Sequence, residues 1–306
     1  MKISVLIPVY NNEFTIIELY ERLIAVFNET NFKYEIIFID DCSSDKSYEK
    51  IINICMHNKN VILVKLLKNV GQRFALMAGL KCASGDYILN LDADLQDPPE
   101  LIKLIFNKIL KKSDLIIGVR SETSESFIRK LTSYIQHIFL NFLNSSYPVK
   151  GYTVFCISRK LAEKVKKKGN NISILQLEIL KHDYDCESFF YKRKKRVNGQ
   201  SEFTFFSRFL LGTEMIAQSK FSLPKFFLNL NLFILFFLLI YITKIIYIYF
   251  QTAYFFYEQL LLSVFVFILF SFYLFFLIFI AKYISTVVDK VIPRNKFQIE
   301  KIINKS

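Results

Sequence analysis

The sequence lacks the signatures of several common protein classes. Its five cysteines are odd in number and form no CxxC pair, so we expect reduced thiols, with neither a disulfide framework nor a zinc site. No GxxxxGKS/T loop occurs, and no GxGxxG follows the first apolar run, which disfavours P-loop and Rossmann-type dinucleotide enzymes. Internal repeats and low-complexity linkers are also missing.

A secretion signal is missing as well. The opening residues MKISVLIPVY contain one lysine and an apolar run that is too short for a signal peptide, and no small-residue cleavage site follows them. We therefore expect the N-terminal part of the chain to stay in the cytosol.

Charge is absent from two windows near the C-terminus, residues 226–243 and 259–281. An apolar helix of about 20 residues crosses a bilayer core, whereas a helix buried in a protein core seldom stays apolar on all faces for this long. The pattern predicts two membrane helices within residues 223–282. Because lysines and arginines lie mainly on the outer flanks of this pair, the positive-inside rule places both termini in the cytosol.

The net charge of +13 favours an acidic partner. We favour an anionic membrane surface over nucleic acid, because the basic run YKRKKR at 191–196 lies a short way ahead of the predicted membrane helices. A solvated charged face is the alternative for that run. A membrane-tethered nucleic-acid binder would need interleaved aromatic and basic residues, for which FFYKRKKR is the only hint.

Apolar runs alternate with helical patterns along the first 120 residues. The expected strands are residues 2–10, 34–41, 61–67, 86–94 and 113–120, and the expected helices are 15–30, 43–58, 71–83 and 98–112. Thr15 is the candidate N-cap of the first helix, and prolines occupy the first turn of the last. This alternation predicts an α/β fold with a mainly parallel sheet and helices on both faces.

Carboxylates gather where the second and fourth strands end. Asp40 and Asp41 follow one strand, and Asp92 and Asp94 follow the other, at the edge where parallel sheets bind ligands. Asp92 and Asp94 alternate by two, so both project from one side of an extended segment and repel each other unless a cation lies between them. Oxygen ligands without nearby His or Cys favour Mg²⁺ or Mn²⁺, and magnesium often shares its shell with substrate phosphates, as in a pyrophosphate-containing nucleotide. A capped, solvated turn is the alternative.

Four segments resemble the family-2 glycosyltransferases of the GT-A fold in order and spacing: SVLIPVYNN, FIDDCSSDKS, LLKNVGQRFALMAGLKCASGDYILNLDADLQDPPE and GVR. Four further matches are typical of its polyprenyl-phosphate hexosyltransferases, the group of dolichyl-phosphate mannose synthases and their undecaprenyl-phosphate counterparts. These are DADLQDPPE, RKLTSYI, KRVNGQSEF and SKFSLPKF.

The resemblance implies a layout for the whole chain. Residues 1–222 would form a cytosolic GT-A (nucleotide-diphospho-sugar transferase) domain, with amphipathic juxtamembrane segments at about 126–144 and 203–222. Residues 223–282 would form the two-helix membrane region, and 283–306 a basic cytosolic tail. The expected location is the cytoplasmic membrane, crossed more than once. A helix that faces a protein partner is the alternative for 126–144.

The resemblance also implies roles for individual residues. The catalytic residues would be Asp92, Asp94, Arg120 and Arg196; the donor nucleotide would contact Pro8, Tyr10, Asp41 and Ala93; the acceptor or phosphates would contact Arg129, Ser133 and Ser201; and Mg²⁺ or Mn²⁺ would be held by Asp92, Asp94 and Gln96. The guanidinium fork of arginine suits phosphate, and a surface ion pair is the alternative for each arginine.

Several positions depart from the family pattern. Asn12, followed by Glu13, stands where the family often has Glu, and Gln200 and Glu202 replace two frequent lysines. The segment GYTVF at 151–155 lacks the Asp or Arg often found after its glycine. Most of these departures fall on the acceptor side.

The resemblance implies inverting transfer of a sugar from a UDP- or GDP-sugar to a polyprenyl phosphate. A phosphate acceptor is already anionic, so it needs positive charge and positioning rather than a general base. Glu178 is the only tempting base between residues 151 and 200, and its setting is helical. A hydroxyl acceptor that uses Glu178, and a non-enzymatic scaffold that binds a nucleotide sugar or a protein, remain alternatives, and a homo-oligomer stays open. Nucleic acid is not an expected partner.

Overall fold

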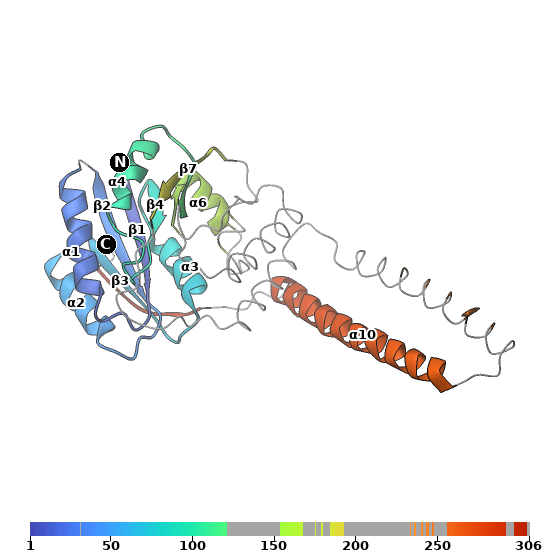
Figure 1. Ribbon diagram of the computed structural model, residues 1–306. Coiled ribbons are helices and arrows are strands. Elements are labelled where there is room, and N and C mark those ends of the chain that lie inside the picture. The colour runs from blue at the N-terminus through green and yellow to red at the C-terminus, as the bar shows by residue number, and fades with distance from the viewer. Residues whose placement is uncertain are drawn as a thin grey trace. The chain divides into compact units, whose positions relative to one another are not determined.

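The computed structural model describes residues 1–30, 32–120, 154–167, 184–192, 256–291 and 297–304, together with single residues at 175, 179, 233, 236, 240, 243, 244 and 247 (Figure 1). The chain divides into two compact units. The first unit comprises Met1–Glu202 and Pro293–Ser306, and the second comprises Phe203–Ile292.

The first unit is built on a sheet whose strands lie in the order β7-β5-β6-β4-β1-β2-β3-β8. Their bounds are β1 Lys2–Val9, β2 Lys33–Asp40, β3 Val61–Leu66, β4 Tyr87–Asn90, β5 Leu115–Arg120, β6 Phe155–Ser158, β7 Cys186–Tyr191 and β8 Ile299–Ile303. The pairs β1–β2, β1–β4, β2–β3 and β5–β7 are parallel, whereas β6 and β8 run antiparallel to their neighbours. The expected α/β fold with a mainly parallel sheet is confirmed.

The strand order reverses at β1. The chain passes from β1 to β2 and β3 on one side, and then returns to place β4 on the other side of β1. Such a switch point opens a crevice at the carboxyl ends of the two strands, where ligands bind in open α/β sheets. The end of β1 and the end of β4 therefore define where a functional site is expected.

Helices cover both faces of this sheet. They are α1 Ile16–Asn28, α2 Ser47–His57, α3 Gln72–Cys82, α4 Leu101–Ile109 and α6 Arg159–Lys166. One core includes buried side chains of α1, α2 and α4, and the other includes those of α3 and α6. Along β1, Val5 and Ile7 face the first core and Leu6 faces the second, which explains why the strand is apolar throughout.

The fourth expected strand is shorter than the sequence predicts. β4 ends at Asn90, so Asp92 and Asp94 lie in the loop that follows it rather than on an extended strand. The expected helix at 98–112 likewise begins only at Leu101, because Pro98 and Pro99 form turns whose carbonyls accept the amides of Leu101 and Ile102.

The C-terminal segment returns to the first unit. β8 pairs antiparallel with β3, and Lys65 Nζ lies 3.0 Å from Glu300 Oε2 across this pair. Asn304 Nδ2 donates to the carbonyl of Val61 at 3.1 Å, and Phe297 is buried in the core that includes α3. From the sequence we expected residues 283–306 to form only a basic tail, and we predicted no strand there.

The second unit contains α10, which runs from Phe256 to Val291 and includes the helix expected at 259–281. In the part of the chain that the structure describes, no helix is long and apolar enough to cross a membrane. Of the window 226–243 only four helical positions are described, and the segments 126–144 and 203–222 lie outside the described residues.

Candidate active site

The loops that follow β1 and β2 are fastened to each other at the carboxyl edge of the sheet. Asn11 holds a left-handed φ of 54°, and its Oδ1 accepts the amide of Ser44 at 2.9 Å. The amide of Asn12 donates to Ser47 Oγ at 2.9 Å, and that of Glu13 donates to Asp45 Oδ2 at 3.0 Å. Asn12 and Glu13, where the sequence departs from the family pattern, thus join the two loops through their backbone amides.

Asp41 fastens a third loop to the same edge. It is buried, and its carboxylate accepts the amides of Val70 at 2.8 Å and Gly71 at 2.7 Å, directly before α3. Gly71 has φ 86°, a conformation in which a side chain would be strained. Burial raises the pKa of Asp41, and the two amides act in the opposite direction. The predicted contact of Asp41 with a nucleotide stays a prediction.

Asp40 is the most isolated carboxylate of this edge. It is fully buried at the end of β2; the amide of Ser43 donates to Oδ1 at 3.3 Å, and Oδ2 has no hydrogen-bond partner among the described residues. Burial raises the pKa of Asp40, and the hydrogen bonds from Ser43 counteract part of that shift.

The loop after β4, residues 91–97, alternates strictly in burial and is called the acidic loop below. Asp92, Asp94 and Gln96 are half-buried, whereas the residues between and beside them are buried, which are Leu91, Ala93, Leu95 and Asp97. The three residues that the family resemblance assigned to a metal therefore share the more accessible side of one loop. Although the segment is a loop, the expectation that Asp92 and Asp94 share a side agrees with this pattern.

Local hydrogen bonds fix the shape of the acidic loop. The amide of Gln96 donates to Asp94 Oδ1 at 3.1 Å, and Leu95 between them has a left-handed φ of 57°. Gln72 Nε2, at the start of α3, donates to Asp92 Oδ1 at 2.7 Å. The carbonyl of Ala93 accepts Thr15 Oγ1 at 2.6 Å.

The donor chemistry of the acidic loop fits a hard divalent cation. Asp92, Asp94 and Gln96 offer only oxygen ligands on the accessible side, the set that Mg²⁺ and Mn²⁺ prefer. Among the described residues, no group of three or more His, Cys, Asp and Glu is placed to hold a metal. A cation held by Asp92, Asp94 and Gln96 would share its shell with water or a substrate, as magnesium commonly does.

The remaining predicted residues fall into two groups. On the nucleotide side, Pro8 is buried within β1, Ala93 is buried in the acidic loop, and Tyr10 just after β1 is 36% exposed. On the acceptor side, the backbone of Arg120 ends β5, and its side chain is not described. The others lie outside the described residues: Arg129, Ser133, Glu178, Arg196, Gln200, Ser201 and Glu202.

Sequence reasoning missed three side chains that hold the acidic loop. They are Gln72, Thr15 and Tyr191, whose hydroxyl donates to Asp97 Oδ1 at 2.7 Å. Thr15 was expected to cap α1; it occupies the N-cap position, but its hydroxyl makes no cap hydrogen bond. The hydroxyl donates to the carbonyl of Ala93, a buried residue of the acidic loop, and thereby satisfies that carbonyl.

A mainly parallel sheet with an acidic loop at its switch point defines a GT-A-like α/β domain. The chain belongs to glycosyl transferase family 2, whose model matches residues 4–176. The resemblance drawn from the sequence motifs is thereby confirmed.

Curated relatives agree with this assignment. An undecaprenyl-phosphate 4-deoxy-4-formamido-L-arabinose transferase of Photorhabdus laumondii is 41% identical over 135 residues, which cover 44% of this chain and 42% of the relative. An uncharacterized glycosyltransferase of Synechocystis sp. is 35% identical over 134 residues, 44% of this chain and 42% of the relative. The chain thus spans about two fifths of the length of these relatives.

A solved structure of glucosyl-3-phosphoglycerate synthase from Mycobacterium tuberculosis, in complex with Mn²⁺, uridine-diphosphate-glucose and phosphoglyceric acid, is also similar. It is 18% identical, with a TM-score of 0.48, and covers 71% of this chain and 77% of that chain.

Proposed function

We propose that the protein transfers a sugar from a nucleotide-diphosphate sugar to a membrane polyprenyl phosphate. The observation that carries the proposal is the acidic loop, which presents Asp92, Asp94 and Gln96 on one accessible side at the switch point of a family-2 domain. Similarity to a relative named as an undecaprenyl-phosphate sugar transferase supports the choice of acceptor.

Asp92, Asp94 and Gln96 would hold Mg²⁺ or Mn²⁺, which when bound supplies positive charge to a diphosphate leaving group. Other residues of the chain position these metal-binding side chains. Gln72 orients Asp92 through its hydrogen bond, and Asp41 fixes the loop that presents Gln72. Preorganised groups of this kind stabilise charge because they need not rearrange when it develops.

The acceptor requires positioning rather than proton removal. A lipid phosphate carries its own negative charge, so the residues around it must neutralise charge and align the attacking oxygen. Arg120, Arg129 and Arg196 are our proposed contacts to phosphate, because the arginine fork binds phosphate oxygens in pairs. Ser133 and Ser201 are the proposed hydroxyl contacts.

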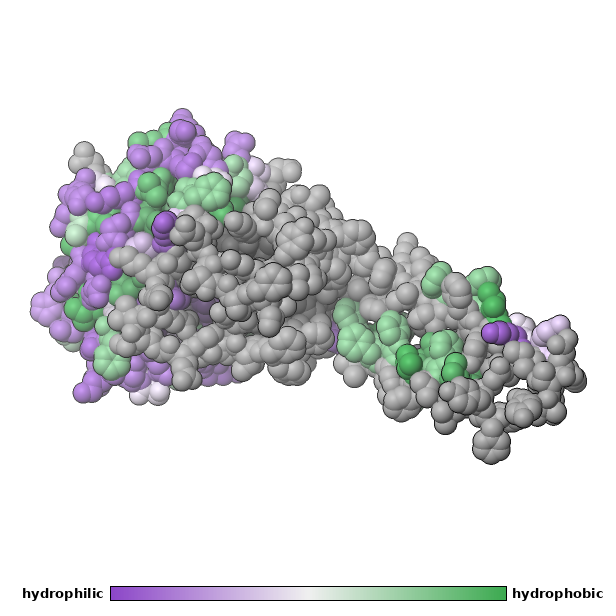
Figure 2. Space-filling model, viewed as in Figure 1, coloured by the Kyte–Doolittle hydropathy of each residue, from purple (hydrophilic) through white to green (hydrophobic). Residues whose placement is uncertain are grey.

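We further propose that the second unit anchors the enzyme in the cytoplasmic membrane. Residues 259–281 contain no charged side chain, and they lie within a single continuous helix, α10. Large apolar side chains of α10 are exposed, including Phe270 at 56% and Ile268 at 58%, and Figure 2 shows the described residues of this unit mostly in green. Apolar surface of this extent favours lipid over water.

The pairing of β8 with β3 supports the proposed topology. Both segments belong to the first unit, so a second unit that crosses a membrane would have to bring the chain back to the side from which it left. An even number of crossings, such as the two helices at 226–243 and 259–281, satisfies this condition. Both termini would then be cytosolic.

A donor screen tests the proposed function. Purified full-length protein in detergent would receive undecaprenyl or dolichyl phosphate, Mg²⁺ or Mn²⁺, and a panel of UDP- and GDP-sugars. We expect one donor to give a glycolipid that disappears on chelation of the metal. Donor hydrolysis without glycolipid would contradict the acceptor and favour a hydroxyl acceptor, and inactivity with every donor would favour a scaffold.

A further inference from the structure

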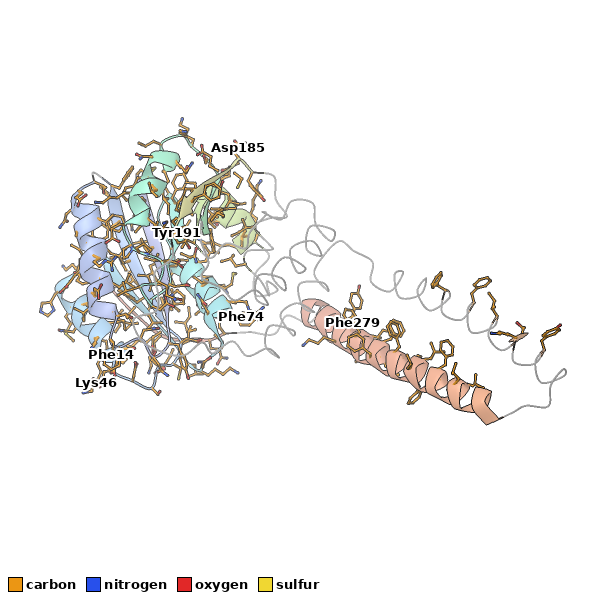
Figure 3. The ribbon with its side chains drawn as sticks, viewed as in Figure 1. Phe14, Lys46, Phe74, Asp185, Tyr191 and Phe279 are labelled. Carbon is orange, nitrogen blue, oxygen red and sulfur yellow. The ribbon has the colours of Figure 1, made fainter. Side chains whose placement is uncertain are left out.

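Two buried hydrogen bonds hold the acidic loop, and their donors lie far from it in the sequence on either side. Thr15, at the start of α1, donates to the carbonyl of Ala93. Tyr191, which ends β7 and is labelled in Figure 3, donates to the carboxylate of Asp97. Asp97 is 0% exposed and Tyr191 is 5% exposed. A buried carboxylate is costly unless it is hydrogen-bonded, so the Tyr191 hydroxyl contributes directly to the stability of the loop's present conformation.

Tyr191 also pairs with one of the residues proposed to contact phosphate. In the parallel pair of β5 and β7, Tyr191 is the register partner of Arg120. In the sequence, the basic run that includes Arg196 continues directly after Tyr191. The bond from Tyr191 to Asp97 therefore links the acidic loop to the strand ends that lead into the proposed acceptor side.

Gly118 provides the space that the Tyr191 ring occupies. A Cβ at Gly118 would lie 3.0 Å from Cε1 of Tyr191 and 3.1 Å from Cζ of Phe189. Any side chain at Gly118 would therefore push against the tyrosine ring from the neighbouring strand. The position of the ring depends on this glycine of the GVR segment.

The conformation of the acidic loop requires such support. Leu95 has a left-handed φ of 57°, which is unfavourable for a residue with a Cβ and persists only where the surroundings hold it. Leu95 lies between Asp94 and Gln96, and Asp97 follows directly. Holding Asp97 therefore holds the turn that sets the relative positions of Asp94 and Gln96.

We propose that Tyr191 is a positioning residue of the acidic loop: by holding Asp97, its hydroxyl keeps Asp94 and Gln96 where they bind a divalent cation. The inference rests on the proposed function for its metal site and adds a residue from β7 to it. Tyr191 acts through Asp97 and touches neither substrate nor metal.

The test measures Mn²⁺ binding to the purified full-length protein by electron paramagnetic resonance. Tyr191→Phe removes only the hydroxyl, and we expect the dissociation constant for Mn²⁺ to rise about tenfold, the scale seen when a group that orients metal ligands is removed. Tyr20→Phe is the matched control, because the Tyr20 hydroxyl accepts a hydrogen bond from Asn58 Nδ2 at 3.2 Å and serves no part of the acidic loop. Unchanged Mn²⁺ binding in Tyr191→Phe, or equal weakening in Tyr20→Phe, would overturn the proposal.

Further variants separate positioning from loss of fold. Asp97→Asn keeps an acceptor oxygen for Tyr191 and should bind Mn²⁺ like the wild type, whereas Asp97→Ala should bind it weakly. In the Asp97→Ala background, Tyr191→Phe should cause no further weakening, because the two changes remove one interaction. Additive losses would contradict the mechanism. Gly118→Ala should weaken Mn²⁺ binding without removing any polar group.

Measuring the same proteins in the transfer assay distinguishes failure of the proposed function from failure of the Tyr191 proposal. If the wild type binds Mn²⁺ but transfers no sugar, the proposed function fails, and the Tyr191 proposal is still decided by the binding comparison. If the wild type binds no Mn²⁺ at millimolar concentration, the Tyr191 proposal is overturned. In the transfer assay, Tyr191→Phe should raise the metal concentration that gives half the maximal rate. The rate at saturating metal should stay within about twofold of the wild-type rate.

Discussion

Asp94 is the single residue on which the proposed chemistry depends most. It lies half-buried on the accessible side of the acidic loop, where its Oδ1 accepts the amide of Gln96 at 3.1 Å. Asp94→Ala should abolish metal-dependent turnover while changing the free energy of unfolding by only about 1 kcal/mol. Glycolipid formation and thermal melting, measured on one preparation, check both parts.

Glu49→Ala provides the control for that prediction. Glu49 is an exposed carboxylate on α2, so its loss changes the net charge equally without touching the acidic loop. Full transfer activity in Asp94→Ala would contradict the assignment of Asp94 as a metal ligand.

The contacts of Glu35 predict how the stability of the protein depends on pH. It is buried, lies 2.5 Å from Lys2 Nζ, and accepts hydrogen bonds from Ser4 Oγ at 2.5 Å and the Ser84 amide at 2.6 Å. Burial acts to raise the pKa of Glu35, but the bonds from Lys2, Ser4 and Ser84 together lower it below 4.5. The stability contributed by its charge is therefore present above pH 4.5 and is lost as the pH falls through the folded-state pKa.

Glu35→Gln should accordingly lower the free energy of unfolding by about 2 kcal/mol at pH 7, with the difference from wild type shrinking in acid. Urea unfolding at pH 7 and pH 3 measures this. Burial raises the pKa values of Asp40 and Asp41, which gives them the opposite pH dependence, but both proteins contain them and the comparison cancels their contribution. A difference that stays constant with pH would refute the role of the Glu35 charge. The exposed Glu21 serves as control in Glu21→Gln.

Single residues were predictable from the sequence only where a local pattern marks them. The spacing of Asp92 and Asp94 after an apolar run marked the acidic loop, and the family resemblance added Gln96. Tyr191 and Thr15 act across 94 and 78 residues of sequence, and no local spacing indicates such partners. The hydroxyl of Thr15 looked like a helix cap because caps are local, and a tertiary bond took its place.

Among the elements, β8 gives the clearest prediction. It covers the edge of β3, which would otherwise expose unpaired amides and carbonyls. Deleting residues 297–306 should lower the midpoint of thermal unfolding by about 5 °C or more and promote aggregation. Substituting Lys301 and Lys305 by Ala, which removes charge but leaves the strand, is the matched control. An unchanged midpoint after the deletion would show that β8 contributes little to the sheet.

The first five strands were predictable because each is a nearly continuous apolar run between helical segments. Both faces of this sheet are covered, so β1 to β5 carry apolar residues on both sides. β7 and β8 are peripheral strands with charged or exposed positions, including Glu187 and Glu300, and their pairing depends on a neighbouring strand far away in the sequence. Nothing local distinguishes such segments from loops.

At the scale of the whole molecule, the proposed membrane anchor makes a prediction in cells. The full-length protein should remain in the membrane pellet after washing with alkaline carbonate, because apolar helices stay in lipid when electrostatic contacts are removed. Epitope tags at the two ends should both be protected from protease in intact cells and both be cleaved after lysis. Release by carbonate would contradict the anchor, and opposite exposure of the two tags would contradict an even number of crossings.

The central claim is that this family-2 domain delivers a sugar to a lipid phosphate. The most direct measurement compares undecaprenyl phosphate with undecaprenol as acceptor for the same purified protein, nucleotide-sugar donor and divalent metal, with the lipid product detected by mass spectrometry. We predict a mass increase of one sugar on the phosphate lipid only, lost on chelation and in Asp94→Ala. A glycosylated undecaprenol, or an equal product from both lipids, would contradict it.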